Sequence, residues 1–331
     1  MGKIDFILTW VDGEDSTWIN QRKKYDKNGS NAENKAVHYR DYGTLKYWFR
    51  MVEKYAPWVN KVHFVTCGQK PEWLNEKNPK LNLVNHADFM DEKYLPTFSI
   101  NPIELNFHNI KGLEEQFVYF NDDTFICAPV KESDFFKKGL PCDSFESSSL
   151  IPSVKNEVIT YILFNDLLLL NSNHNKKKLL KNHFFKWTSL KYGKSVFRNL
   201  YHMPVGKFGG FINPHLPNSF LKSTYQEVWG KEQEYLSKVC ENKFRTKEDV
   251  NQYLMRYWQL VTGKFAPRSP KIGKCFVLGD DNIQIKKHLN KKSLKLICIN
   301  DNPNQEEICE QLSWLKQELE SLFPEKCSFE K

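Results

Sequence analysis

The sequence has no CxxC pair, no long apolar run and no glycine-rich loop after its first predicted strand. Its eight cysteines are scattered, which argues against a zinc site or a disulfide framework and favours structural, free thiols. The most apolar window, residues 158–170, contains Asn165 and Asp166 and is too short to span a bilayer. Because GxGxxG is missing from the loop after the first strand, no dinucleotide fingerprint is predicted.

A secretory signal is also missing. Met1-Gly2-Lys3 leads directly into the apolar segment that starts at Ile4, and Asp5 interrupts that segment. We therefore expect a cytoplasmic protein, with contact at the surface of a membrane as the closest approach to a bilayer.

Acidic residues are missing from one long segment. Residues 167–226 contain ten Lys or Arg and no Asp or Glu, whereas the rest of the chain is close to neutral. This basic block, interleaved with aromatic residues, indicates an anionic partner: a phosphorylated substrate, an anionic polysaccharide or the inner membrane surface. No nucleic-acid-binding module is recognisable, so nucleic acid is not expected. For the outer lysines at 176–178, a plainly solvated basic face is the favoured interpretation.

The order of predicted elements favours an α/β fold that is Rossmann-like, with a mainly parallel sheet and a helical insertion. Strands are predicted at 4–10, 61–66, 81–84, 117–120, 275–278 and 294–299, and the main helices at 41–55, 155–171, 175–185, 219–239, 247–262 and 308–322. Residues 1–150 and 265–331 should form the catalytic core. Residues 151–264 should form a helical insertion that carries the basic block and part of the active site.

The run Phe117-Val118-Tyr119-Phe120 ends abruptly in Asn121-Asp122-Asp123. Ligands of open α/β sheets bind at the carboxyl ends of strands, and two adjacent carboxylates there need a compensating cation or ligand. The alternative is a solvated turn, because Asn and Asp also favour turns.

Other segments carry similar polar chemistry. Asn300-Asp301 ends a later strand, and Asp12-Gly13-Glu14-Asp15 follows the first. Pro102 should open a short helix that places Glu104 and His108 on one face. For Asp41, capping of the following helix is at least as well supported as ligand contact.

Four segments together resemble the conserved regions of the Stealth family, the sugar-phosphate transferases of capsule synthesis that are related to GlcNAc-1-phosphotransferase. They are Ile4 to Asp15; Arg40-Asp41 through Glu53-Lys54-Tyr55-Ala56-Pro57-Trp58-Val59 to Asn121-Asp122-Asp123; His215-Leu216-Pro217 with Lys222 and Phe244-Arg245; and Cys298-Ile299-Asn300-Asp301. The fourth departs from the family pattern, because Asn302 stands where the family has a second aspartate. This replacement weakens the prediction of a multi-carboxylate metal site there.

The resemblance implies transfer of a sugar-1-phosphate from a nucleotide-diphosphate sugar, such as UDP-GlcNAc, to a hydroxyl of a glycan acceptor. Nucleoside monophosphate would leave, and capsule or surface polysaccharide would be the product. The resemblance implies these roles: catalysis by Glu104, Asp123, His215 and Arg245; substrate binding by Asp12, Gly13, Asp15, Arg40, Arg50, Asn121, Lys222 and Asn300; and a divalent cation, Mg²⁺, held by Asp122 and Asp301. Asp123 or His215 would be the base, Arg245 would grip phosphate, and Glu104 would orient His215, the acceptor or the sugar.

Two other functions remain open on the residues alone. A metal-dependent glycosyltransferase would use the same paired aspartates but would release nucleoside diphosphate, and a polyanion-binding protein would release neither nucleotide. Without the resemblance, His215 fits a packed loop histidine and Arg245 a surface partner of Glu248 or Asp249. His202 lies at the wrong spacing from Arg245 to match the third region.

Overall fold

The computed structural model describes residues 2–26, 39–152, 157–301 and 308–331. The predicted loop at 27–36 and Asn302 lie outside these residues. Strands are β1 (Ile4–Thr9), β2 (Val62–Thr66), β3 (Leu81–Asn85), β4 (Gln116–Phe120), β5 (Thr124–Ile126), β6 (Phe136–Lys137), β7 (Leu140–Asp143), β8 (Asn218–Leu221), β9 (Ala266–Pro267), β10 (Gly273–Val277) and β11 (Leu296–Asn300). Helices are α1 (Ser16–Tyr25), α2 (Leu45–Tyr55), α3 (Ile100–Leu105), α4 (Glu132–Phe135), α5 (Val158–Asn173), α6 (Lys176–Trp187), α7 (Ser195–His202), α8 (Lys222–Cys240), α9 (Gln252–Val261), α10 (Asn282–Lys291) and α11 (Ile308–Leu322).

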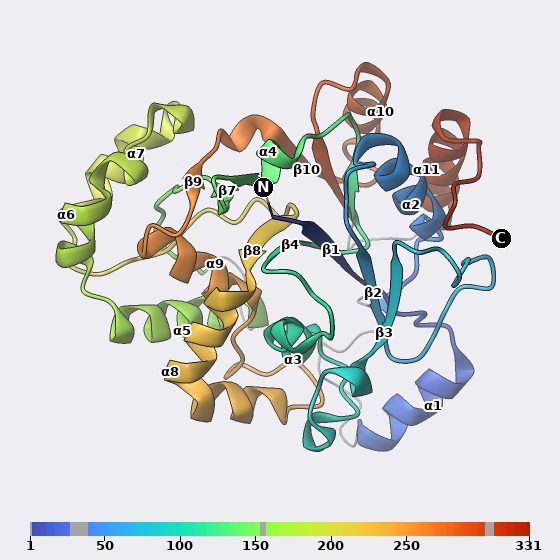
Figure 1. Cartoon of the computed structure of the whole chain (residues 1–331), viewed down its shortest axis with the longest axis horizontal. Helices are drawn as coiled ribbons and strands as arrows, with labels where there is room; N and C mark the ends of the chain where they lie inside the picture. Colours follow the sequence, from blue (N-terminus) through green and yellow to red (C-terminus); the bar gives the residue numbers. More distant parts are fainter. Residues whose placement is uncertain (1, 27–38, 153–156, 302–307) are drawn as a thin grey trace.

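The central sheet has the strand order β3-β2-β1-β4-β8 (Figure 1). The first four strands are parallel, and only the edge strand β8 runs antiparallel, against β4. The predicted mainly parallel α/β fold is therefore confirmed. The sheet places the carboxyl ends of β1 and β4 side by side, with Phe6 in register with Val118.

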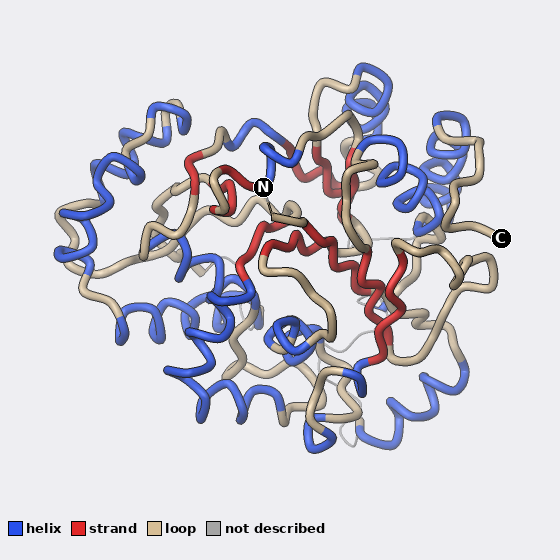
Figure 2. The backbone as a smooth tube through the Cα atoms, viewed as in Figure 1, coloured by secondary structure: helices blue, strands red, loops and turns tan. Residues whose placement is uncertain are grey.

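Successive side chains along the strands point to opposite faces of this sheet, and both faces are covered by apolar residues. Phe6 and Val118 belong to one buried apolar cluster, which also contains residues of α2, α10 and α11. Ile7 and Phe117 point the other way, into a cluster with residues of α3, α8 and α9. Strands buried on both faces read as continuous apolar runs, and this is why their sequence signal is strong. Figure 2 shows the strands as a central layer between helices.

The two C-terminal strands correct one expectation. β10 and β11 were expected to join the main sheet, but they form a second sheet with β5, in which β10 and β11 are parallel and β5 is antiparallel. Both sheets share one apolar cluster, in which Phe276 and Ile299 pack together with Phe6 and Phe120.

The segment predicted as a helical insertion also contributes to the main sheet. β8 lies within residues 151–264 and pairs with β4 through Phe220 and Phe117. The rest of the segment is largely helical, with α5 to α9 on one side of the molecule (Figure 1). The division into core and insertion stays a prediction.

Candidate active site

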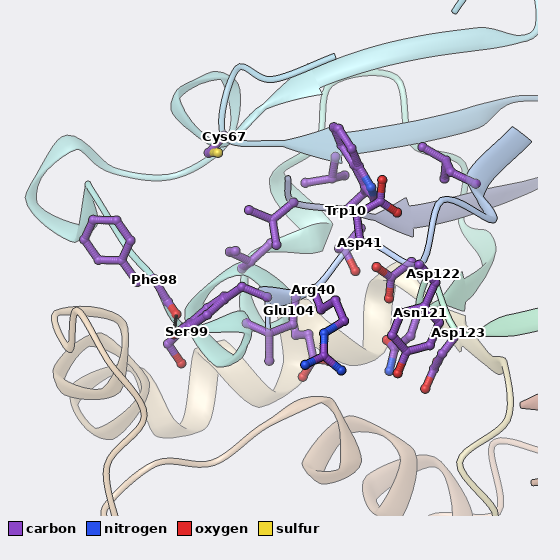
Figure 3. Close-up of a pocket in the computed structure, with 18 of the residues that line it drawn as sticks. Trp10, Arg40, Asp41, Cys67, Phe98, Ser99, Glu104, Asn121, Asp122 and Asp123 are labelled. Atoms are coloured by element: carbon purple, nitrogen blue, oxygen red, sulfur yellow. Dashed lines mark hydrogen bonds between the residues drawn. The ribbon is translucent and has the colours of Figure 1, made fainter. Parts of the chain in front are cut away.

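A cavity of about 430 Å³ opens at the carboxyl ends of β1, β4 and β11. Nine of the predicted site residues line it: Arg40, Glu104, Asn121, Asp122, Asp123, His215, Arg245, Asn300 and Asp301. In Figure 3 the side chains of Asn121, Asp122 and Asp123 gather at one end, Phe98 and Ser99 lie at the other, and Arg40 and Glu104 lie between them. The chain thus brings together residues from both halves of the sequence.

Asp123 and His215 form the central pair of this cavity. Oδ2 of Asp123 lies 3.2 Å from Nε2 of His215. Burial by itself would lower the pKa of His215, but the hydrogen bond and charge of Asp123 outweigh it and raise that pKa to about 9. His215 is therefore an imidazolium at neutral pH, paired with a carboxylate.

The backbone around His215 is held in an uncommon conformation. Its φ is +47°, in the left-handed region that side chains with a Cβ rarely adopt. Just upstream, the buried Arg256 donates to the carbonyl of Ile212 and to Oδ1 of Asn213, while its other nitrogens grip the carboxylate of Asp143. Such strain persists where the surrounding structure enforces it, and here it turns the imidazole toward Asp123.

Carboxyl groups crowd the β4 end of the cavity. Burial, reinforced by the charges of Asp123 and Asp41, raises the pKa of Asp122 to about 8. Burial also raises the pKa of Asp41, which does not cap α2 as proposed: the N-cap is Thr44, and Asp41 accepts a hydrogen bond from the backbone of Gly43. A cluster of this kind favours a bound cation or a cationic ligand.

β11 closes this end of the cavity. The backbone N–H of Ile299 donates to the carbonyl of Asp123 over 2.9 Å, which fixes Asn300 and Asp301 beside β4. Asp301 pairs with Arg40 at 2.8 Å. The thiol of Cys298 lies 3.5 Å from Oδ2 of Asp123, so this cysteine, predicted to be purely structural, contacts the central pair.

Glu104 enters the cavity from α3. Its Oε2 accepts the backbone N–H of Gln252, and the hydroxyl of Tyr119 also donates to it. Burial nevertheless raises the pKa of Glu104 to about 7, so the group titrates near neutrality. His108, predicted to share a face with Glu104, instead lies against Tyr225 and Trp229, away from the cavity lining.

Arg245 lies on the loop after α8, and this loop is tied down by a buried carboxylate. Asp249 accepts hydrogen bonds from Asn101, Asn242 and Thr246, so it is not the surface partner of Arg245 that was considered. Within the described ranges no carboxylate lies at ion-pair distance from Arg245. The guanidinium lines the cavity as a cation available to a ligand.

A divalent cation has a candidate set of ligands here. Oδ2 of Asp123, Nε2 of His215 and Sγ of Cys298 all lie within 4.8 Å of one another, and Oδ1 of Asp123 is buried with no partner among the described residues. Nitrogen and sulfur ligands suit ions such as Zn²⁺, whereas Mg²⁺ prefers oxygen. The predicted ligands Asp122 and Asp301 line the same cavity but stand outside this three-residue group.

Two predicted ligands lie elsewhere and are corrections. Arg50 is buried in α2, where its guanidinium grips Glu330 and the carbonyl of Phe323, so it fastens the C-terminal segment and cannot reach a diphosphate. Lys222 begins α8, and its ammonium lies 3.5 Å from the carbonyl of Leu113, outside the cavity lining. Both residues were predicted as substrate ligands because each is a cation in a segment that resembles a Stealth region, and a cation can bind phosphate.

In the loop after β1, Trp10 and Val11 line the cavity, whereas the predicted ligands Asp12, Gly13 and Asp15 do not. Oδ1 of Asp12 accepts from the backbone of Glu14, and Asp15 caps α1 by accepting from Thr17 and Trp18. Gly13 is required for space, since a Cβ there would lie 2.0 Å from the carbonyl oxygen of Tyr39. Of these three residues, Gly13 packs against Tyr39, which lines the cavity together with Arg40, while the carboxylates of Asp12 and Asp15 accept hydrogen bonds within their own loop and at the start of α1.

Sequence reasoning missed several residues of the cavity. They include Trp18, Tyr39, Cys67, His86, Thr97, Phe98 and Ser99. Burial lowers the pKa of His86 to about 4, so this histidine is neutral. A single aromatic residue such as Trp18 or Phe98 gives no sign in the sequence that it borders a cavity rather than the core.

The chain matches the models of three Stealth conserved regions: region 1 over residues 2–30, region 2 over 38–144 and region 4 over 287–331. This chain belongs to the Stealth family. It is 42% identical to the capsular polysaccharide phosphotransferase WcwK of Streptococcus pneumoniae, over 100% of this chain and 99% of that protein. It is 40% identical to the exopolysaccharide phosphotransferase cps2G of Lactiplantibacillus plantarum, over 99% of this chain and 96% of that one, and 40% identical to the receptor polysaccharide phosphotransferase WefC of Streptococcus gordonii, over 99% of each.

Among solved structures, a complex of galactosyltransferase LgtC with donor and acceptor sugar analogues aligns over 96% of this chain and 95% of that one. The TM-score is 0.40 at 11% identity, too low to carry an argument. The third conserved region, which contains His215 and Arg245, stays a resemblance, although the fold places both residues in the cavity.

Proposed function

We propose that this Stealth protein transfers a sugar-1-phosphate from a nucleotide-diphosphate sugar to a hydroxyl of a glycan, in the synthesis of a capsular or surface polysaccharide. Whole-chain identity of 40–42% to polysaccharide phosphotransferases supports the reaction class. The single observation that carries the site is the Asp123–His215 pair at the carboxyl end of β4, in a cavity that also presents Arg245.

The reaction forms one bond and breaks one. An acceptor oxygen attacks the phosphorus next to the sugar, and the bond from that phosphorus to the oxygen bridging the two phosphates breaks. Nucleoside monophosphate leaves, and the anomeric carbon keeps its oxygen, so the sugar keeps its configuration. Positioning and charge neutralisation dominate such a transfer.

The charges of the cavity suit this chemistry. Arg245 would hold phosphate oxygens with its planar fork, and the His215 imidazolium would add a second positive charge next to Asp123. Because His215 already carries a proton at neutral pH, Asp123 is the better acceptor for the hydroxyl proton. Glu104 would accept a hydrogen bond from a hydroxyl of the sugar or the acceptor.

A divalent cation would neutralise the diphosphate and the acid cluster together. We assign Mg²⁺ to the oxygen atoms of Asp122 and Asp301, since a phosphate-bound Mg²⁺ uses one or two carboxylates. The neutral, aromatic end of the cavity, with Phe98 and Ser99, would take the nucleoside (Figure 3). UDP-GlcNAc is the donor to test first.

The leaving nucleotide tests the proposal. The full-length protein is incubated with UDP-GlcNAc, Mg²⁺ and oligosaccharides prepared from the host's surface polysaccharide, and nucleotides are separated by anion-exchange chromatography. Release of UMP is expected. Release of UDP would instead identify a glycosyltransferase, and turnover of neither across a panel of nucleotide sugars would indicate a polyanion-binding protein.

A further inference from the structure

Helices α5, α6 and α7 form a flank of the molecule whose outer side chains are both apolar and basic. The flank lies opposite α1, α2 and α11 (Figure 1). We propose that this flank docks on the surface of an anionic lipid bilayer, with its aromatic side chains in the interface and its lysines against the head groups.

Large apolar side chains are solvent-exposed on all three helices. On α6, Phe185 is 87% exposed; after it, Leu190 is 89% exposed. On α7, Phe197 and Tyr201 are 75% and 79% exposed. Scattered exposed apolar residues are ordinary, but a concentration on one flank marks an interaction surface.

The spacing places these side chains with lysines on common helical faces. On α6, Lys178 and Lys181 precede Phe185 by seven and four residues, and on α7 Phe197 and Tyr201 are four apart with Lys194 three before Phe197. These three lysines are exposed. Apolar and basic residues that share a face are typical of helices that lie in a membrane interface.

An apolar cavity of about 930 Å³ opens beside α5, one of the three helices of the flank. Tyr161, Phe164 and Leu168 of α5 line it, at a spacing that puts them on one face, and Lys207 lines it as well. Such a cavity could admit part of an acyl chain from a lipid whose phosphate lies near the lysine. No helix among the described residues is long and apolar enough to cross a bilayer, so the contact would be peripheral.

The charge and the exposed apolar side chains of the flank favour a bilayer over two other partners. A second copy of the chain would bring together two faces that carry exposed lysines and, over residues 167–226, no Asp or Glu, and like charges oppose such a contact. A soluble anionic polysaccharide would satisfy the lysines but would leave Phe185 and Leu190 in water. A bilayer containing acidic lipid satisfies both.

Vesicle co-sedimentation tests the proposal with three forms of the full-length protein. The charge variant is Lys178→Glu/Lys181→Glu/Lys194→Glu, and the apolar variant is Phe185→Ser/Phe197→Ser/Tyr201→Ser. The matched control is Ile283→Ser/Lys287→Glu on α10, where Ile283 is 87% exposed and Lys287 is exposed as well. Thermal melts check that each form is folded.

We expect wild type and the control to bind phosphatidylglycerol vesicles and to release as salt rises, with little binding to phosphatidylcholine. The charge variant should lose about 100-fold in affinity, at roughly fivefold per lysine removed, and the apolar variant should lose about tenfold or more. Wild type that fails to bind acidic vesicles would overturn the proposal, and so would an apolar variant that binds like wild type. Lipid-free sedimentation showing dimers that the apolar variant abolishes would assign the flank to a second copy.

Discussion

Asp123 and His215 are 92 residues apart in the chain, yet their side chains meet at 3.2 Å, beside the carboxyl end of β4. Asp123 comes from the turn after a core strand, and His215 from the loop that leads into β8, the antiparallel edge strand. The pairing of β8 with β4 delivers the histidine to the carboxylate.

Asp123→Asn should lower kcat by about 10²–10⁴-fold, the usual contribution of a general base. The melting temperature should change little, because the lost ion pair is offset by relief of repulsion between Asp123 and Asp122. For the same reason, the pKa of Asp122 should fall from about 8 in this variant, as measured by carboxyl NMR titration. Glu92→Gln, at an exposed position, is the control. Substantial activity in Asp123→Asn would remove the β4 end from the mechanism.

Arg245→Lys should lower kcat/KM for the nucleotide sugar by about 10–100-fold, because a point charge cannot reproduce two parallel hydrogen bonds to phosphate. Folding should be unaffected, since Asp249 and its three donors hold the loop without Arg245. Arg198→Lys, at a partly exposed arginine that pairs with the buried Glu146, serves as the control. Equal kinetics for the two variants would show that Arg245 does not grip the donor.

The pH dependence of kcat/KM should report Glu104. Burial raises its pKa to about 7, so below that pH the carboxyl is neutral and cannot accept two hydrogen bonds as a carboxylate does. Activity should therefore rise as the pH rises through about 7. Glu104→Gln should be slow and should lack this limb. A limb that persists unchanged in the variant would belong to another group.

Arg50→Met should affect stability rather than donor binding. Arg50 and Glu330 form a buried, bidentate pair, and removing one partner leaves an uncompensated charge that costs about 3–5 kcal/mol. Urea unfolding measures this loss. KM for the donor should stay within about twofold of wild type, because the substitution removes no contact with the donor. A raised KM with unchanged stability would restore Arg50 as a ligand.

The ion pair of Glu330 adds a pH signature to the same experiment. Burial alone would raise the pKa of Glu330, but its hydrogen bond to Arg50 lowers it below the ordinary value. A depressed carboxyl pKa contributes stability above its unfolded pKa, and that stability is lost as the pH falls through the folded value. Arg50→Met should therefore show a shallower loss of stability in acid than wild type.

The core strands could be predicted because each carries its own signal. β1, β2, β3 and β4 are apolar runs bounded by polar turns, and each was predicted to within a residue or so. β8 was missed because Asn218–Leu221 is four residues long and runs directly into α8, so only its pairing with β4 defines it as a strand. α7 was missed although Val196, Phe197, Leu200 and Tyr201 recur at helical spacing, because it is only eight residues long and gives the periodicity few turns to repeat.

The location of a predicted site residue agrees with the cavity where its chemistry and its position in the sequence coincide. Asp122 and Asp123 directly follow a strand, so they had to lie at the edge of the sheet where ligands bind. Arg50 could not be assigned correctly, because its partner Glu330 is 280 residues away and no feature of the sequence near either residue indicates the pair. Cys298 was set aside as structural for the same reason: its contact with Asp123 exists only after β11 pairs with β5.

The most direct test of the central claim follows the phosphorus atom itself. UDP-GlcNAc labelled with ³²P at the phosphate next to the sugar is incubated with the enzyme and acceptor oligosaccharides, beside an Asp123→Asn control. Transfer of sugar-1-phosphate predicts that the label moves into the oligosaccharide as a phosphodiester while UMP is released unlabelled, and that the control moves none. If the acceptor gained sugar while the label stayed with UDP, the protein would be a glycosyltransferase and the account would be contradicted.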